Sequence, residues 1–272
     1  MSGPAASSAP FGRRLLEVAA NDQLGAYRLL RLRDRGGPVF APGQFAMLAA
    51  EQRWGGGEGE RPFLARAFSV ARQRGEESHY LLEDVGPGTH RLCELAPGER
   101  VWAVGPLGRG FQPPPAEGRR ALLVGGGVGI APLVILQDSL PSPALALLGF
   151  RDGARARGAE LLADVRVATD DGSVGHHGLV TDLLERELDA DAHALVYACG
   201  PAAMLEGVRA LCARLQVPAQ LALEAPMACG FGACYGCVVG VRGGRYVRVC
   251  VDGPVLDAHE LERVDEHAGA PA

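Results

Sequence analysis

The stretch Ala121-Leu-Leu-Val-Gly-Gly-Gly-Val-Gly-Ile-Ala-Pro132 decides how the middle of this sequence is expected to fold. Its first four residues are apolar and predict a buried strand, the glycines predict a tight loop, and the last residues predict the start of a helix. Backbone amides and the helix dipole of such a unit can hold a pyrophosphate. A glycine run also serves as an ordinary tight turn, but its place at the first strand of an α/β unit favours nucleotide binding. The candidate contacts are Gly125, Gly126, Gly127 and Gly129.

Apolar runs and amphipathic stretches alternate on both sides of this loop, over residues 119–223. The predicted strands are Ala121–Val124, Ala144–Leu148, Val165–Ala168, Ala194–Ala198 and Gln220–Leu223. Apolar residues at helical spacing predict helices over Leu179–Leu188 and Met204–Leu215. This alternation predicts an α/β domain with a parallel sheet covered on both faces.

A second loop is expected at the same edge of that sheet. Tyr197-Ala-Cys199-Gly200-Pro201 closes one of the later strands. Ligands of open α/β sheets bind beyond the carboxyl ends of the strands, so Cys199, Gly200 and Pro201 are candidate nucleotide contacts. Position alone leaves open that Cys199 is an ordinary buried thiol.

Residues 11–115 have a different pattern, with short period-2 segments broken by Gly and Pro, and predict a small antiparallel β-barrel. The predicted strands are Arg14–Ala19, Tyr27–Arg33, Gln44–Ala49, Ala67–Ala71, His79–Val85 and Arg100–Val104. The glycine-rich tract Trp54–Glu60 is expected to be a long hairpin loop. Three consecutive prolines within Gln112–Gly118 predict a linker to the α/β domain.

Residues 224–272 are rich in Gly and Cys and show little periodicity, so we expect something other than a hydrophobic core to order them. Cys229-x4-Cys234-x2-Cys237, followed by Cys250, has the spacing of a plant-type [2Fe–2S] site. Glycines between the ligands let backbone amides turn towards the sulfurs. The alternative is a four-thiolate zinc site, although zinc sites usually present two close cysteine pairs. Cys93 and Cys212 are expected to be small core residues.

Composition excludes several other classes of protein. The 272 residues carry a net charge of −5 and no basic stripe, which argues against a nucleic-acid partner. No apolar run approaches the ~18 residues that span a bilayer, and the first ten residues do not resemble a signal peptide. Seven cysteines, an odd number, suit a reducing compartment, so we expect a cytoplasmic protein without a membrane partner.

These motifs together resemble the ferredoxin–NADP reductase superfamily, in which a flavin-binding barrel precedes a nicotinamide-binding α/β domain. Arg66-Ala67-Phe68-Ser69 is similar to its Arg-x-Tyr/Phe-Ser flavin signature, with Ala67 where proline is usual. The short tail, Met227–Cys237 and Val249–Val255, resembles one branch: the electron-transfer subunit of NAD-dependent dihydroorotate dehydrogenase. Similar segments elsewhere extend the match over nearly the whole chain: Pro42–Phe45, Gly86–Thr89 and Gly105–Gly108.

The resemblance implies FAD in the barrel. Arg66 would bind the pyrophosphate, and Ser69 would donate a hydrogen bond near the isoalloxazine ring. Gly88 and Thr89 would supply an amide and a hydroxyl to the phosphates. Ala67 and Phe68 complete the signature, and the backbone of Leu81, Leu82 and Glu83 would contact the flavin.

The resemblance also implies a relay in pyrimidine (UMP) biosynthesis. An FMN-containing dihydroorotate dehydrogenase subunit, in a heterotetramer of two copies of each chain, would pass electrons through a [2Fe–2S] cluster on Cys229, Cys234, Cys237 and Cys250 to FAD and then to NAD⁺. No catalytic acid or base is expected in this chain. Asp170 and Asp171, near the expected ribose site, would repel a 2′-phosphate and favour NAD over NADP.

Two rivals remain open at this point. One is an NAD(P)H:acceptor reductase with another partner, such as the small subunit of a bifurcating ferredoxin:NADP oxidoreductase. That subunit typically has a carboxylate at the position of Cys229, so Cys229 favours the dihydroorotate dehydrogenase branch. The other is a redox-sensing or structural subunit that holds a metal without turning over a nucleotide, which the flavin signature disfavours.

Overall fold

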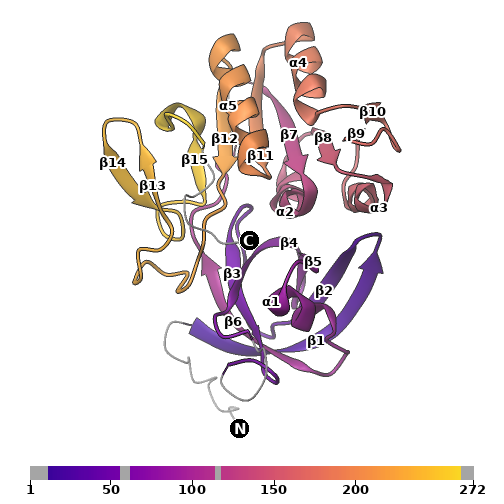
Figure 1. Cartoon of the computed structure of the whole chain (residues 1–272), viewed down its shortest axis with the longest axis vertical. Coiled ribbons are helices and arrows are strands. Elements are labelled where there is room, and N and C mark those ends of the chain that lie inside the picture. Colours follow the sequence, from indigo (N-terminus) through magenta and orange to yellow (C-terminus); the bar gives the residue numbers. More distant parts are fainter. Residues whose placement is uncertain (1–11, 56–61, 114–117, 265–272) are drawn as a thin grey trace.

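A closed antiparallel barrel forms the N-terminal part of the chain (Figure 1). The computed structural model describes residues 12–55, 62–113 and 118–264. The barrel follows the order β1-β2-β5-β4-β3-β6, and β1 closes it by pairing with both β2 and β6. Its strands are β1 (Arg13–Leu24), β2 (Tyr27–Arg33), β3 (Phe45–Ala50), β4 (Arg66–Arg74), β5 (Glu77–Glu83) and β6 (Arg100–Leu107). The predicted barrel and all six of its strands are confirmed, with shifted ends for every strand except β2.

Two barrel strands separate before they end. The β4–β5 ladder runs from the pair Arg74↔Glu77 to the pair Val70↔Tyr80 and stops there. Beyond that point β4 continues beside β3, and β5 continues beside β2. The edges of Ala67–Ser69 and Leu81–Glu83 therefore face each other without a ladder between them. A short helix, α1 (Pro87–Cys93), follows β5 at this opening and was not predicted.

The second half is a seven-stranded sheet in the order β10-β9-β8-β7-β11-β12-β15. The first six strands are parallel, and five of them correspond to the predicted strands, whereas β10 was not predicted. They are β7 (Arg120–Gly126), β8 (Leu145–Phe150), β9 (Val165–Thr169), β10 (His176–His177), β11 (Ala194–Cys199) and β12 (Ala219–Ala222). Apolar residues of β7 alternate between two cores, since Leu122 and Val124 belong to one and Leu123 to the other. The sheet is thus buried on both faces.

Helices cover both faces of this sheet (Figure 1). α4 (Val180–Ala190) and α5 (Ala202–Leu215) pack on one face, and α2 (Ala131–Ser139) and α3 (Gly153–Ala156) on the other. The two helices predicted from apolar periodicity correspond to α4 and α5. No helix of the described residues is long and apolar enough to cross a membrane.

The C-terminal segment is tied to both halves. β15 (Val255–Asp257) extends the large sheet by pairing antiparallel with β12, and β13 (Val238–Val241) with β14 (Arg245–Arg248) forms a separate hairpin. Cys237, Val249 and Cys250 are buried in the same core as α4 and α5. The expectation that something other than a hydrophobic core orders this segment therefore needs a correction: part of the segment packs into the core, although its sequence shows little periodicity.

The boundaries 11–115, 119–223 and 224–272 remain predictions. Most of the Trp54–Glu60 loop, part of the proline linker, and everything beyond Val264 lie outside the described residues.

Candidate functional site

A cleft of about 360 Å³ lies where the barrel opening meets the carboxyl edge of the sheet. All three parts of the chain line it. The barrel contributes Phe45, Ala67, Phe68, Ser69, Leu81, Glu83, Val85 and Thr89; the α/β part contributes Val128, Gly129, Ala131, Pro132, Cys199, Ala222 and Leu223; the C-terminal segment contributes Glu224, Ala225, Met227 and Pro254. Its volume is in the range of small-molecule sites. The structure thus brings together residues that the sequence placed in two separate candidate sites.

The barrel side of the cleft fits a flavin. Because the β4–β5 ladder stops at Val70↔Tyr80, the backbone groups of Leu81–Glu83 and Ala67–Ser69 that point into the gap are not used between the two strands. Buried backbone groups need partners, and a ring edged with N–H and C=O groups would satisfy them. Leu82 itself is fully buried in the barrel core, so only its backbone can serve a ligand.

Arg66 is placed as a phosphate ligand would be. Its guanidinium lies against Gly88, where a Cβ would come 2.8 Å from Nε, so any side chain at this position would displace the guanidinium. Arg66 donates to the Leu64 carbonyl at 2.6 Å and lies 6.0 Å from the ring centroid of Trp54. None of the described carboxylates forms an ion pair with it. The described residues thus contain no salt bridge that would explain this half-buried arginine.

The hydroxyl of Thr89 makes hydrogen bonds within its own turn. The hydroxyl accepts hydrogen bonds from the amides of Val85 and Gly86 and donates one to the Gly86 carbonyl, all at 2.9–3.0 Å. It therefore orders the turn into α1. A further bond from this hydroxyl to a phosphate would require it to give up the Gly86 carbonyl, so its direct contact stays a prediction.

Ion pairs fix the two walls of the cleft relative to each other. Arg155 of α3 binds Glu83 of β5 at 2.8 Å and Asp152 at 2.6 Å. Arg72 of β4 binds Asp138 of α2 at 2.5 Å. The side chain of Glu83 thus binds Arg155 across the contact between the two halves, and the predicted contact of its backbone with a flavin stays a prediction.

The glycine loop and the Cys199 turn meet at the carboxyl edge of the sheet. β7 and β11 are paired so that Gly125 lies opposite Cys199. A Cβ at Gly129 would come 2.6 Å from the Gly200 backbone, and one at Gly126 would come 2.9 Å from Pro201. Gly127 has φ +55° and nothing within 4 Å of its Cβ position, so it borders open space. The predicted pairing of the two loops is present, while their contact with a nucleotide stays a prediction.

Sequence reasoning missed Glu224. It lines the cleft with its side chain partly exposed, and desolvation by the surrounding protein raises its pKa above the usual range. Burial, and then the nearby Glu224 carboxylate, raise the pKa of Cys199 well above its usual value, so this thiol is neutral and inert near pH 7. The available signal was position: Glu224 follows the carboxyl end of β12 almost directly.

Asp170 and Asp171 follow β9 and are exposed. The Asp171 carboxylate accepts hydrogen bonds from the amide and hydroxyl of Ser173 at 2.9 and 2.6 Å, and these bonds lower its pKa. A fixed negative charge thus stands at this end of the sheet. Its contact with a ribose stays a prediction.

The four C-terminal cysteines form two pairs. The sulfurs of Cys237 and Cys250 lie 3.2 Å apart. The side chain of Cys234 lies beside that of Cys229 and lowers its pKa. Cys234 is exposed and Cys237 and Cys250 are buried, so the second pair forms the inner side of the site.

Backbone amides surround these sulfurs. Burial alone would raise the pKa of Cys229, but amides of Cys234, Phe231 and Ala233 outweigh it and lower the pKa to about 6. The amide of Gly236 points at the Cys234 sulfur and that of Cys250 at the Cys237 sulfur, both at 3.4 Å. Thiolates need such donors when they ligate a metal.

The two-and-two arrangement separates the two metal hypotheses. A tetrahedral zinc with Zn–S bonds of ~2.3 Å would hold all four sulfurs about 3.8 Å from one another. Within the described residues, no three of the four sulfurs lie within 4.8 Å. The residues therefore fit a binuclear centre, in which each metal takes two thiolates, better than a single zinc ion.

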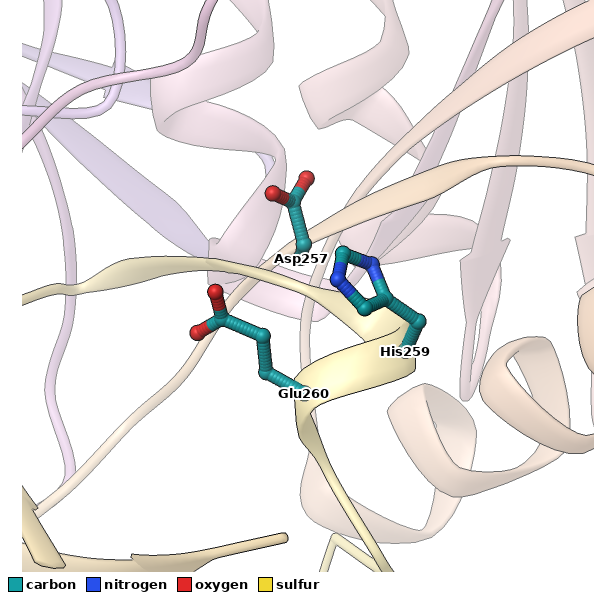
Figure 2. A group of neighbouring side chains, drawn as sticks. All are labelled: Asp257, His259 and Glu260. Carbon is teal, nitrogen blue, oxygen red and sulfur yellow. The ribbon is translucent and has the colours of Figure 1, made fainter.

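One other group of potential metal ligands exists in the described part of the chain. Figure 2 shows Asp257, at the end of β15, beside His259 and Glu260 of the following 3₁₀ turn. Arg119, Arg209 and Arg242 line the same cavity as Asp257 and His259. Their positive charges oppose a cation, and we assign no metal to this group.

The cysteine site lies close to the cleft. Met227 lines the cleft and Cys229 follows two residues later, so their Cα atoms are at most about 7 Å apart. Gly230 packs on the barrel, where a Cβ would come 2.5 Å from Cγ of Met47. The barrel, the sheet edge and the cysteine loop thus meet at one place.

Known proteins match this arrangement. Residues 224–262 match the family model described as the iron-sulfur cluster binding domain of dihydroorotate dehydrogenase B. The chain is 40% identical over 226 residues to the dihydroorotate dehydrogenase B (NAD(+)) electron transfer subunit of Caldanaerobacter subterraneus subsp. tengcongensis, covering 81% of this chain and 86% of that protein. The subunit of the same name from Bacillus caldolyticus is 42% identical over 214 residues, which cover 74% and 80% of the two chains.

Solved structures show the same fold. A structure reported under "Insights into flavin-based electron bifurcation via the NADH-dependent reduced ferredoxin-NADP oxidoreductase structure" has a TM-score of 0.78 and 25% identity, over 97% of this chain and 92% of its own. The ferredoxin reductase of carbazole 1,9a-dioxygenase has a TM-score of 0.63 and 24% identity, over 75% and 65%. On its fold, its cysteine site and its relatives, the chain belongs to the family of dihydroorotate dehydrogenase B (NAD(+)) electron transfer subunits.

Proposed function

We propose that this chain carries electrons between a dihydroorotate dehydrogenase catalytic subunit and NAD⁺, through a [2Fe–2S] cluster and FAD, in pyrimidine biosynthesis. The net reaction would be dihydroorotate + NAD⁺ → orotate + NADH + H⁺, in which two electrons leave the carbon substrate and one hydride equivalent reaches the nicotinamide. The observation that carries the proposal is the meeting of the flavin cleft, the glycine loop and the paired cysteines at one place.

Bound FAD would supply the exchange between hydride transfer, which moves two electrons, and single-electron transfer, which suits an iron–sulfur cluster. The protein's residues would bind and position the groups. Arg66 and the Gly88 amide would hold the pyrophosphate, and the open edges of Ala67–Ser69 and Leu81–Glu83 would hold the ring. The loop Gly125–Gly129 and the turn Cys199–Pro201 would hold the dinucleotide against it.

The cysteine loop would fix the cluster. Cys229, Cys234, Cys237 and Cys250 would be its ligands. The amides of Phe231, Ala233 and Cys234 favour the thiolate of Cys229, whereas burial raises the pKa of Cys250 to about 12, so a bound metal would displace the proton of that thiol. The charge at Asp170 and Asp171 supports NAD over NADP, because a 2′-phosphate would be repelled. We further propose a cytoplasmic heterotetramer with two copies of each subunit.

A content assay tests this proposal. Anaerobically purified chain should hold about two iron and two acid-labile sulfide ions per chain together with one FAD. Stoichiometric zinc without sulfide would contradict it. If cluster and FAD are present but the cognate catalytic subunit does not support reduction of NAD⁺ by dihydroorotate, the rival function, reduction of another acceptor, would stand instead.

A further inference from the structure

Arg248, at the end of β14, connects the β13–β14 hairpin to the cysteine loop. Its Nη1 donates a hydrogen bond to the Gly232 carbonyl at 3.4 Å, and its guanidinium lies 5.4 Å from the ring centroid of Tyr235. Both of these residues belong to the loop from Cys229 to Cys237, which has no helix or strand of its own within the described residues. Arg248 therefore links this loop to regular structure.

Two successive amides of the loop face two different sulfurs. Burial raises the pKa of the Cys250 thiol, and the Gly232 amide opposes that shift. Burial also acts to raise the pKa of Cys229, but backbone amides that include the Ala233 amide lower it. Consecutive amides of a turn can form a concave site for negatively charged groups. The peptide between Gly232 and Ala233 is therefore part of the surroundings of the cysteine site.

Arg248 and the sulfur of Cys229 lie at opposite ends of that peptide. In a trans peptide the C=O and N–H groups lie in one plane and point in opposite directions. A cation on the Gly232 carbonyl therefore directs the Ala233 N–H away from itself, towards the sulfur. Hydrogen bonds in a chain polarise one another, so the bond to the carbonyl also makes this N–H a stronger donor.

The position of Arg248 is itself fixed. Its amide donates a hydrogen bond to Asp252 at 2.9 Å, and its Nε lies 3.6 Å from the same carboxylate. Gly232 has φ +87°, and a Cβ there would come 2.7 Å from Cγ2 of Val251 and 3.2 Å from Nη1 of Arg248. Glycine thus allows both the left-handed backbone and the close approach of the guanidinium.

We propose that Arg248 is a positioning residue for the iron–sulfur cluster: its charge-assisted hydrogen bond to Gly232 holds the Ala233 amide on the Cys229 sulfur and raises the reduction potential of the cluster. This inference rests on the proposed function, in which the cluster receives one electron at a time from the catalytic subunit and passes it to FAD. Net charge and hydrogen bonds to the sulfurs set the potential of such clusters. The added electron makes the ligand sulfurs more negative, so a donor and a cation beside them stabilise the reduced state more than the oxidised one.

The test measures the midpoint potential of the cluster in the full chain loaded with FAD and cluster, by anaerobic redox titration followed by EPR. Arg248→Met keeps an apolar stem but removes donor and charge. It should shift the equilibrium towards the oxidised cluster roughly tenfold, which is about 59 mV more negative for a one-electron couple. Arg248→Gln keeps an N–H donor without the charge and should shift the potential less in the same direction, since neutral hydrogen bonds are weaker than charge-assisted ones. Arg245→Gln removes the same charge from an exposed position on the same strand and should leave the potential unchanged.

Further readouts make the outcomes distinct. Bleaching of FAD by NADH should be the same in all variants, because Arg248 does not line the cleft. An unchanged potential in Arg248→Met, or an equal shift in Arg245→Gln, would overturn the inference. If Arg248→Met takes up no cluster, Arg248→Gln decides: a lower potential there would support the inference, and an unchanged one would overturn it. If the unaltered chain holds FAD but no iron–sulfur cluster, the proposed function fails, and this inference fails with it.

Discussion

The glycine loop of the α/β part and the cysteine loop of the C-terminal segment are both glycine-rich turns, but they are expected to bind different ligands. In both, a glycine-rich turn leaves room for backbone amides to face a negatively charged ligand, which we propose to be a dinucleotide at the first loop and the cluster thiolates at the second. The loop Gly125–Gly129 is anchored by β7 and α2, so regular structure fixes its shape. The loop from Cys229 to Cys237 has no regular element within the described residues, and its amides converge on the sulfurs of its own cysteines. The first site is therefore expected to persist without its ligand, whereas the second depends on its ligand for order.

The largest expected effect follows from replacing Cys237 with Ser. The harder oxygen suits iron less well than thiolate, and Cys237 is buried beside Cys250, so the inner pair of ligands is lost. Reduction of NAD⁺ by dihydroorotate in the complex should fall by roughly 100-fold or more, as expected when a required ligand is removed. Steady-state turnover and cluster absorbance measure this. Cys212→Ser, at a buried cysteine away from the cluster, is the matched control and should keep the cluster.

Arg66→Ala should have the next largest effect. It removes the one guanidinium that lies against Gly88, and loss of a charge-assisted bond is expected to weaken FAD binding by about 2–3 kcal/mol. Retention of FAD after gel filtration, or titration of the apoprotein, measures the change. Cluster absorbance should persist, because the cysteine ligands are untouched. Full retention of FAD would show that Arg66 is not its phosphate ligand.

Gly127→Val should have a smaller effect on the nucleotide site. The residue has φ +55°, so a branched side chain strains the loop by about 1–3 kcal/mol and enters the open space beside it. We expect NADH to bleach FAD roughly tenfold more slowly, measured by stopped-flow absorbance. Gly243→Val, at another left-handed glycine with open space, is the control for strain alone. An equal slowing in that control would refute a specific role for the loop.

The smallest expected effect concerns the contact between the two halves. Arg155→Ala removes the ion pairs with Glu83 and Asp152 and should lower the free energy of unfolding by roughly 1 kcal/mol, since solvent screens these half-exposed groups. The backbone amide and then the side chain of Arg155 lower the pKa of Asp152. A carboxyl group whose pKa is lowered by folding stabilises the folded state at pH values above its pKa in the unfolded chain. This contribution is lost as the pH falls through its pKa in the folded state. Urea unfolding should therefore show the difference at pH 7 and a smaller difference below about pH 3.8.

The sequence predicted those elements whose formation depends on interactions between residues close together in the chain. β2 was predicted at both ends, because period-2 alternation over Tyr27–Arg33 lies between turn residues. α1 was missed, because Pro87-Gly-Thr reads as a turn. β15 was missed because its pairing with β12 joins residues far apart in sequence, which no local pattern reports.

The candidate site followed the same rule. Two motifs with fixed spacing, the Gly125–Gly129 loop and the four cysteines, could be recognised from sequence, and their ligands stay predictions. The opening between β4 and β5 could not be predicted from sequence. It arises where the pairing of the two strands ends, and no particular residue type marks that point. Glu224 was missed because a single carboxylate has no spacing to recognise.

The central claim is the linear order from nucleotide through FAD to cluster. Its most direct test reduces two variants, once with NADH and once with dihydroorotate through the catalytic subunit. FAD and cluster absorbance are followed in single turnovers. Cys237→Ser should still be bleached by NADH at FAD but should pass no electrons from the dihydroorotate side. Gly127→Val should show the reverse, with slow bleaching by NADH and normal reduction of cluster and FAD from the dihydroorotate side. If both variants, folded and loaded with FAD, lost reduction from both ends, the order proposed for this chain would be contradicted.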